Sequence, residues 1–188
     1  MPVSASPARP KRKMVSATEQ RRFARVVVVV LLLDLVTKLA AEVWLRRSLG
    51  VPVIGDFFQL RLVYNPGAAF GINVGVYSRW VFMGLSMAAL VVLGSMLRTT
   101  REGDGVRLYA LSLITSGAAG NLVDRLRSPR GVVDFLDFTF GTWHFPTFNV
   151  ADSAVTCGAV LLALSLWNEG QQTSPAPVAE ATPPPAGS

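Results

Sequence analysis

Four long apolar runs constrain the fold of this chain more than any other feature. They cover about residues 26–45, 80–97, 106–123 and 150–167, and each approaches the roughly 20 residues that a helix needs to cross a bilayer. The composition agrees with a membrane protein, because 51% of the residues are hydrophobic, only 16% are charged and the mean hydropathy is +0.40. We therefore predict a membrane all-α bundle of four transmembrane helices within a domain of residues 23–168.

Basic residues outside the apolar runs predict the orientation of the bundle. Ten Lys and Arg residues lie in the amino-terminal tail and the 98–107 turn, against seven in the two longer connections. The positive-inside rule then puts both termini in the cytoplasm and the long connections outside. Residues 1–22 and 169–188 are predicted to be disordered tails. We interpret the basic first tail as an anchor near anionic lipid, in preference to a nucleic-acid-binding segment.

The first apolar run has two interpretations. Basic residues precede it, and Ala40 and Ala41 lie near its end, which is also the pattern of a secretory signal peptide. A signal peptide would not account for three further runs, so we favour a spanning helix. Asp34, Lys38 and Glu42 recur in it at four-residue spacing and form one stripe on one face. Charges that face lipid are costly, so this stripe must face protein or water.

The two long connections carry strand patterns. Residues 57–65 are rich in β-formers, and residues 132–140 alternate loosely, so each is predicted to contain a short strand. Pro66 follows the first of them and interrupts regular structure. The chain has a single histidine, His144, and a single cysteine, Cys157, so neither a metal site nor an intrachain disulfide is predicted.

Two aspartates stand at the ends of consecutive apolar runs. Asp124 follows the third run and Asp152 opens the fourth, and consecutive spanning helices run in opposite directions, so both acids are expected at one depth near the outer face. Two carboxylates close together at the edge of a low-dielectric slab cannot both ionise easily, so one is expected to keep its proton. An aspartic protease uses this arrangement: the ionised acid takes a proton from water, and the protonated acid hydrogen-bonds the scissile carbonyl.

Neighbouring residues have predicted supporting roles. Asn121 and Asn149 each lie three residues before an acid and share a helix face with it if the helices extend that far. Arg125 could pair with a carboxylate or with lipid phosphate, and the small residues 117–120 are interpreted as a close helix contact. A proton-coupled transporter is the alternative, because it also places acids in a membrane, although such sites tend to lie near the midplane.

Five motifs in order resemble the lipoprotein signal peptidase (signal peptidase II) family. They are DLVTK (34–38), NPGAAFG (65–71), GAAGNLVDR (117–125), VVDFLDF (132–138) and FNVADS (148–153). The resemblance covers roughly residues 24–167. The chain differs from the family pattern in two places: Leu35 stands where the family often has Gln, and ITSG stands where a Gly-Gly pair is common. Neither difference involves the two acids, so both concern the fit of the substrate more than the catalytic reaction.

The resemblance implies a bacterial inner-membrane aspartic endopeptidase that cuts prolipoproteins before a cysteine bearing a diacylglyceryl group. It places the catalytic pair on Asp124 and Asp152, and the supporting polar residues on Asp34, Lys38, Asn65, Asn121, Arg125 and Asn149. It implies no metal or organic cofactor, and an extracytoplasmic β-element with a mobile loop in residues 50–79. The implied partners are lipidated prolipoprotein substrates and membrane lipids, without nucleic acid, and we expect a monomer.

Overall fold

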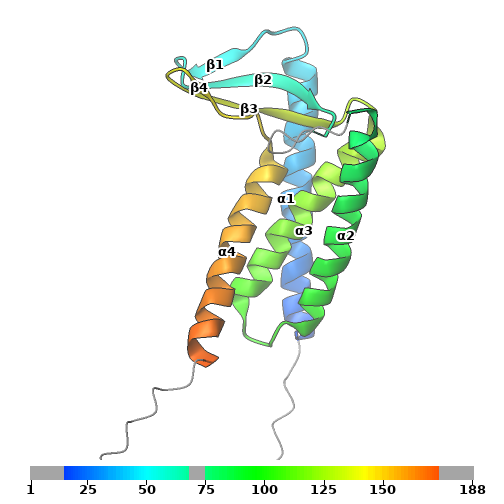
Figure 1. Ribbon diagram of the computed structural model, residues 1–188, viewed down its shortest axis with the longest axis vertical. Helices are drawn as coiled ribbons and strands as arrows, with labels where there is room; N and C mark the ends of the chain where they lie inside the picture. The colour runs from blue at the N-terminus through cyan, green and yellow to red at the C-terminus, as the bar shows by residue number, and fades with distance from the viewer. Residues whose placement is uncertain (1–14, 68–74, 174–188) are drawn as a thin grey trace, which may run out of the picture.

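The computed structural model describes residues 15–67 and 75–173. Four helices pack into a bundle, and a four-stranded sheet covers one end of it (Figure 1). The helices are α1 (Ala17–Trp44), α2 (Ser78–Thr99), α3 (Gly105–Arg127) and α4 (Val150–Thr173). The strands are β1 (Val51–Ile54), β2 (Phe58–Asn65), β3 (Val132–Phe140) and β4 (Trp143–His144), and a short 3-10 helix, η1 (Gly75–Tyr77), precedes α2. The predicted helical bundle with a small β-element is confirmed.

The sheet joins the two long connections. Its strands are antiparallel in the order β1-β2-β3-β4. In the pairing of β2 with β3, Asn65 lies opposite Val132 and Val63 lies opposite Asp134. The end of β2 is therefore held beside the start of β3, directly after the last turn of α3. Both predicted strands are confirmed.

Two of the described helices are long and apolar enough to cross a membrane. They are α2 over Ser78–Thr99 and α4 over Val150–Gln171. The helix α1 carries Asp34, Lys38 and Glu42 inside its apolar run, and α3 is interrupted by small and polar residues. The membrane crossing of α1 and α3 therefore stays a prediction.

The first and last helices, α1 and α4, extend beyond their apolar runs. At the start of α1, the Glu19 backbone N donates to Ser16 Oγ at 3.3 Å and the Ser16 backbone N donates to Glu19 Oε2 at 2.8 Å. This capping box satisfies free backbone N–H groups and lets the helix begin at Ala17. Residues 17–22, which were predicted to belong to a disordered tail, are therefore helical. The helix α4 likewise continues to Thr173, and residues 1–14 and 174–188 of the two predicted tails lie outside the described residues.

Polar contacts tie the helix ends together on the side opposite the sheet (Figure 1). The Gly103 backbone N donates to Glu19 Oε1 at 2.8 Å, which joins the turn between α2 and α3 to the start of α1. Arg101 and Arg107 lie 3.1 and 3.4 Å from the Glu169 carboxylate near the end of α4. The start of α1 and the end of α4 thus lie on the same side of the bundle, and the assignment of that side to the cytoplasm stays a prediction.

Glycines bring α3 and α4 into close contact. A β-carbon at Gly117 would overlap the backbone oxygen of Ala151, and one at Gly158 would lie 2.8 Å from the backbone oxygen of Ala110. The prediction that the small residues 117–120 serve close helix packing is confirmed. The contact at Gly117 also fixes the first turn of α4 against α3, and this turn carries Asp152.

Gly117→Leu tests this contact. The added side chain must push α4 away, so we expect the free energy of unfolding to fall by about 1–3 kcal/mol, the usual cost of overpacking a close contact. Gly84→Leu is the matched control, because a β-carbon at Gly84 would meet no described atom of another segment within 4 Å. Thermal unfolding in detergent compares the two. Equal melting temperatures for both variants would contradict the proposed close packing.

Candidate active site

Lys38 lies at the centre of a buried ionic cluster between α1 and α3. Its Nζ is 2.8 Å from Asp34 Oδ2 and 2.9 Å from Asp124 Oδ2, and it donates to Asn121 Oδ1 at 3.0 Å. Only 1% of the surface of Lys38 is exposed, and Asp34 and Asp124 are also buried. Buried charges persist only when they are paired and hydrogen-bonded. The prediction that the stripe on α1 faces protein is therefore confirmed for Asp34 and Lys38.

Asp34 also holds the start of α4. The Ala151 backbone N, in the first turn of that helix, donates to Asp34 Oδ1 at 2.9 Å. A carboxylate in this place satisfies a free N–H group and compensates the positive end of the helix dipole. One side chain of α1 is thus bonded both to Lys38 and to α4, which brings three helices together at the site.

Asn149 and Asp152 cap α4 reciprocally. The Asp152 backbone N donates to Asn149 Oδ1 at 2.9 Å, and the Asn149 backbone N donates to Asp152 Oδ2 at 3.2 Å. The helix begins at Val150, so Asn149 is the residue before its first turn and not part of it. A shared helix face for Asn149 and Asp152 was predicted only if the helix reached Asn149, and it does not. Their three-residue spacing is that of a capping box.

Asn121 contacts the acid of the neighbouring helix. Its Nδ2 donates to Asp152 Oδ1 at 2.8 Å, while its Oδ1 accepts from Lys38 and from Asn149 Nδ2. Asn121 and Asp124 both lie in α3, so they share a helix face as the spacing predicted, and both contact Lys38. The close packing of α3 on α4 adds the contact between Asn121 and Asp152. Lys38 and Asn121 therefore connect Asp124 and Asp152 within one network.

Asp134 in β3 is a third acid of the network, and it was not among the predicted site residues. Its side chain is only 3% exposed, Oδ1 accepts from Asn149 Nδ2 at 2.7 Å, and Asn65 also hydrogen-bonds it. Burial, followed by the negative charge of Asp152, raises the pKa of Asp134 to about 7. Asn149 thus contacts both Asp134 and Asp152. One signal in the sequence could have identified Asp134: it is an acid inside a run of β-forming residues. A carboxylate buried in such a strand needs polar partners, which makes it a candidate site residue.

Asp124 has a different electrostatic environment from Asp134. In addition to Lys38, Arg127 Nη2 lies 3.6 Å from Asp124 Oδ1, and the Val133 backbone N donates to Oδ2 at 3.3 Å. In contrast, no Lys, Arg or His among the described residues lies within 4.0 Å of the Asp134 carboxylate. Asp124 is therefore part of an ion-pair cluster, whereas Asp134 is bound by amides.

The second acid of β3, Asp137, is paired with Arg61 and also contacts His144. Its Oδ2 is 3.0 Å from Arg61 Nε, and its Oδ1 is 2.9 Å from His144 Nε2. Asp137 is three residues from Asp134, so the two side chains point to opposite faces of the sheet. Asp137 and His144 therefore connect strands of the sheet and lie outside the acid network.

Arg125 lies beside the network and packs against α2. Its Nη1 donates to the Asn121 backbone oxygen at 3.1 Å, and its guanidinium lies 5.4 Å from the centre of the Phe82 ring. Its buried Nε has no hydrogen-bond partner within the described chain. No carboxylate among residues 15–67 and 75–173 lies within 4.0 Å of Arg125, so the predicted carboxylate pair is not found there. Pairing with lipid phosphate stays a prediction.

Comparison with known sequences relates most of the chain to one enzyme family. The family model described as signal peptidase (SPase) II matches residues 26–168. Over 141 residues the chain is 45% identical to the lipoprotein signal peptidase of Paraburkholderia phytofirmans, and the match covers 74% of this chain and 80% of the relative. It is 47% identical over 141 residues to the lipoprotein signal peptidase of Paraburkholderia phymatum, and this match covers 73% of this chain and 82% of the relative.

Two solved structures share the fold. One is a bacterial membrane enzyme determined by the in meso method at 2.3 Å resolution; it has a TM-score of 0.75 and 27% identity, and the match covers 90% of this chain and 100% of that one. The other is a bacterial membrane enzyme determined by the same method at 1.9 Å resolution. It has a TM-score of 0.69 and 29% identity, and the match covers 84% of this chain and 97% of that one. The similarity therefore includes both the helices and the sheet.

The raised pKa of Asp134 predicts a pH-dependent stability. A carboxyl with its ordinary pKa of 3.8 loses its proton in the unfolded chain well below neutral pH, whereas folded Asp134 keeps its proton up to about pH 7. Between these two values the folded state binds the extra proton, so the free energy of unfolding should fall as the pH rises and level off above pH 7. Thermal unfolding in detergent over this pH range measures the effect.

Asp134→Asn is the variant that isolates this effect, because an amide does not titrate but its oxygen can still accept from Asn149. We expect the fall in stability between pH 5 and pH 8, a window on either side of about pH 7, to be smaller in Asp134→Asn than in the wild type. Asp56→Asn, in the exposed turn between β1 and β2, should keep the wild-type dependence. Parallel curves for the wild type and Asp134→Asn would show that folded Asp134 holds no extra proton.

Proposed function

This chain belongs to the signal peptidase II family, and we propose that it removes signal peptides from prolipoproteins by cutting before a cysteine that carries a diacylglyceryl group. Membership of the family makes the chain a peptidase. The proposed aspartic mechanism rests on one observation: the carboxylates of Asp134 and Asp152 are both bonded to Asn149.

The identity of the two catalytic acids is part of the proposal. The sequence resemblance assigned them to Asp124 and Asp152, but the contacts favour Asp134 in place of Asp124. Asp124 is ion-paired to Lys38 at 2.9 Å, whereas burial and the charge of Asp152 raise the pKa of Asp134 to about 7. An aspartic peptidase needs one protonated and one ionised carboxyl side by side. Asp134 and Asp152 meet this requirement better than Asp124 and Asp152.

The proposed reaction divides acid and base work between these two residues. The Asp152 carboxylate takes a proton from a water molecule, and the water oxygen attacks the scissile carbonyl carbon. Asp134 hydrogen-bonds the carbonyl oxygen and gives it a proton as the tetrahedral intermediate forms. The intermediate collapses when the C–N bond breaks; the leaving amine takes the proton from Asp152, and the hydroxyl proton of the intermediate returns to Asp134.

The remaining predicted site residues position this pair. Asn121 and Asn149 hold the Asp152 carboxylate from two sides, and Asn65 and Asn149 bind Asp134. The ionic cluster of Asp34, Lys38 and Asp124 fixes α1, α3 and α4 relative to one another. We assign these residues a supporting role, since they act through the geometry of Asp134 and Asp152.

The membrane placement is proposed from the surface of the bundle. Large apolar side chains are exposed on α1, α2 and α4, including Val36, Val91 and Leu164, as expected for helices that face lipid. We propose that four helices span the bacterial inner membrane with both termini in the cytoplasm, and that the monomer carries its site near the outer face. The lipid chains of the substrate would then hold the scissile bond at the depth of the acids.

Three asparagine variants test the choice of acids. Asp134→Asn and Asp152→Asn should each lower kcat by on the order of 10²–10⁴, the usual contribution of a general acid or base. Asp124→Asn should lower stability and keep part of the activity, because its role is to balance Lys38. Cleavage of a purified diacylglyceryl-prolipoprotein by variants shown to be folded measures this. An inactive Asp124→Asn together with an active Asp134→Asn would restore Asp124 to the catalytic pair.

The pH profile provides a second test of the same pair. If protonated Asp134 is the acid, kcat/KM should fall as the pH rises above about 7. Asp124→Asn, although less active than the wild type, should show the same fall in kcat/KM over this pH range. The two pKa values of the profile belong to the coupled pair of acids. A rate that does not change with pH across this range would contradict the role of Asp134.

The lipid requirement is tested on the substrate. A peptide with the same sequence but an unmodified cysteine should be cut much more slowly, because nothing holds it at the membrane surface. Both peptides are assayed in the same detergent micelles at equal concentration. Equal rates would contradict the proposal that the lipid chains hold the scissile bond at the depth of the acids, but they would not affect the assignment of the acids.

A further inference from the structure

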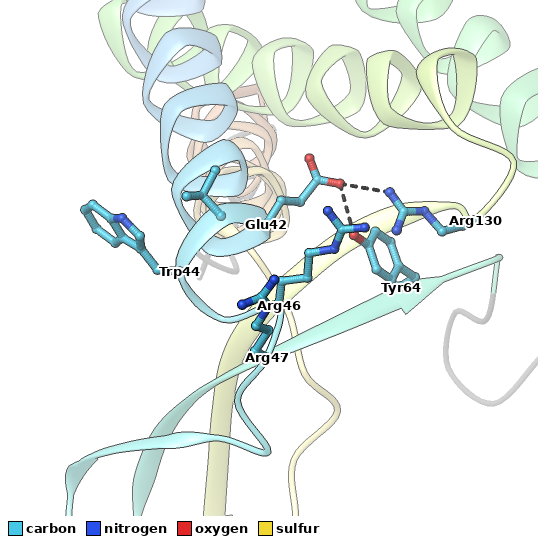
Figure 2. Close-up of a pocket in the computed structure, with 7 residues that line it drawn as sticks. Glu42, Trp44, Arg46, Arg47, Tyr64 and Arg130 are labelled. Carbon is cyan, nitrogen blue, oxygen red and sulfur yellow. Dashed lines mark hydrogen bonds and ion pairs between the residues drawn. The ribbon is translucent and has the colours of Figure 1, made fainter.

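A basic pocket opens beside the last turn of α1, at the sheet end of the bundle (Figure 2). Its volume is about 560 Å³, and it is lined by Glu42, Val43, Trp44, Arg46, Arg47, Tyr64 and Arg130. Apart from Glu42, which continues the stripe on α1, none of these residues was predicted to have a functional role. Three segments that are distant in the sequence contribute to the pocket: the end of α1, the end of β2 and the loop before β3.

The lining of the pocket carries an excess of positive charge. Three arginines face a single acid, Glu42, and this acid is already engaged: it accepts from Tyr64 Oη at 3.1 Å, from Arg130 Nη2 at 3.5 Å and from Arg127 Nη2 at 2.9 Å. Within the described residues, no carboxylate lies within 4.0 Å of Arg46 or Arg47. The pocket therefore presents cationic groups that an anionic ligand can bind.

Arg130 is held in position for this ligand. Its guanidinium lies over the Tyr64 ring, 3.9 Å from the ring centre, and Glu42 contacts both side chains, as the dashed lines in Figure 2 mark. A guanidinium that is fixed by stacking and by one ion pair still has donors for a further acceptor. Planar guanidinium groups bind phosphate oxygens in pairs, which a simple ammonium group cannot do.

One wall of the pocket is apolar and continues along α1. Val43 is 73% exposed and Trp44 is 79% exposed. Val36 and Leu39 are also exposed, and their spacing to Val43 places all three on one helix face. Exposed tryptophan beside an apolar helix face is typical of the level of lipid headgroups. A molecule with its phosphate in the pocket could thus lay its hydrocarbon chains along this face of α1.

We propose that the pocket binds the headgroup of an anionic phospholipid, with its phosphate at Arg46, Arg47 and Arg130. The inference rests on the proposed membrane crossing of α1, which puts the pocket at the level of the outer headgroups. The apolar wall favours a phospholipid over free phosphate. Bound lipid would also fix Tyr64, which is adjacent to Asn65, a residue that hydrogen-bonds Asp134.

Lipid binding to the purified full-length chain tests the proposal. The protein in neutral detergent is titrated with phosphatidylglycerol, with phosphatidylcholine and with inorganic phosphate, and the dissociation constant and the melting temperature are measured. The double variant Arg46→Gln/Arg47→Gln should bind phosphatidylglycerol about tenfold more weakly, or worse, because two charge-assisted contacts are lost. Phosphatidylcholine and inorganic phosphate should stabilise the wild type much less than phosphatidylglycerol does.

Arg98→Gln is the matched control, since Arg98 is an exposed arginine in the last turn of α2, at the opposite end of the bundle. It should bind phosphatidylglycerol like the wild type. If the double variant does not fold, Arg47→Gln alone replaces it. Unchanged lipid binding by the pocket variant would overturn the proposal, and so would equal stabilisation by inorganic phosphate, which would indicate a site for the free ion. Prolipoprotein cleavage, measured on the same samples, reports separately on the proposed peptidase activity.

Discussion

The structure depends on one buried lysine. Lys38 compensates two carboxylates, Asp34 on α1 and Asp124 on α3, and Asp34 in turn binds the first turn of α4. Each of these charges would cost several kcal/mol if it were buried without its partners, so a helix packing that separated them would be strongly disfavoured. Glycine at positions 117 and 120 makes this arrangement possible, because a β-carbon there would collide with Ala151 or Asp34.

In the proposed assignment, the acid of this ionic cluster, Asp124, stabilises the fold, whereas the amide-bound acids Asp134 and Asp152 carry out the reaction. Asp124 lies between Lys38 and Arg127, which suits a structural charge. Asp134 and Asp152 are bound mainly by amide groups, which donate hydrogen bonds without adding a full positive charge. Burial and mutual repulsion can then keep a proton on one member of the pair. In the proposed mechanism, the cluster supplies rigidity and the amide-bound pair supplies the chemistry.

The local sequence pattern predicted the elements of the fold but only part of the site. Apolar runs located the four helices, and four-residue spacing predicted the buried face of Asp34 and Lys38. The partner of Asn121 could not be predicted, because the register between α3 and α4 depends on contacts at Gly117 that spacing within one helix does not contain. Asp134 was missed for a related reason: its neighbours, Asn65 and Asn149, approach it only through strand pairing and the α4 cap.

The end of β2 connects two features that are otherwise separate. Successive side chains of a strand point to opposite faces, so Tyr64 and Asn65 must face different surroundings. Tyr64 lines the basic pocket, and Asn65 hydrogen-bonds Asp134 on the other face. The pairing of β2 with β3 fixes both residues against the strand that carries this acid. A ligand that orders Tyr64 therefore also restricts Asn65, so the two residues link the proposed lipid pocket to the proposed catalytic acid over a single peptide bond.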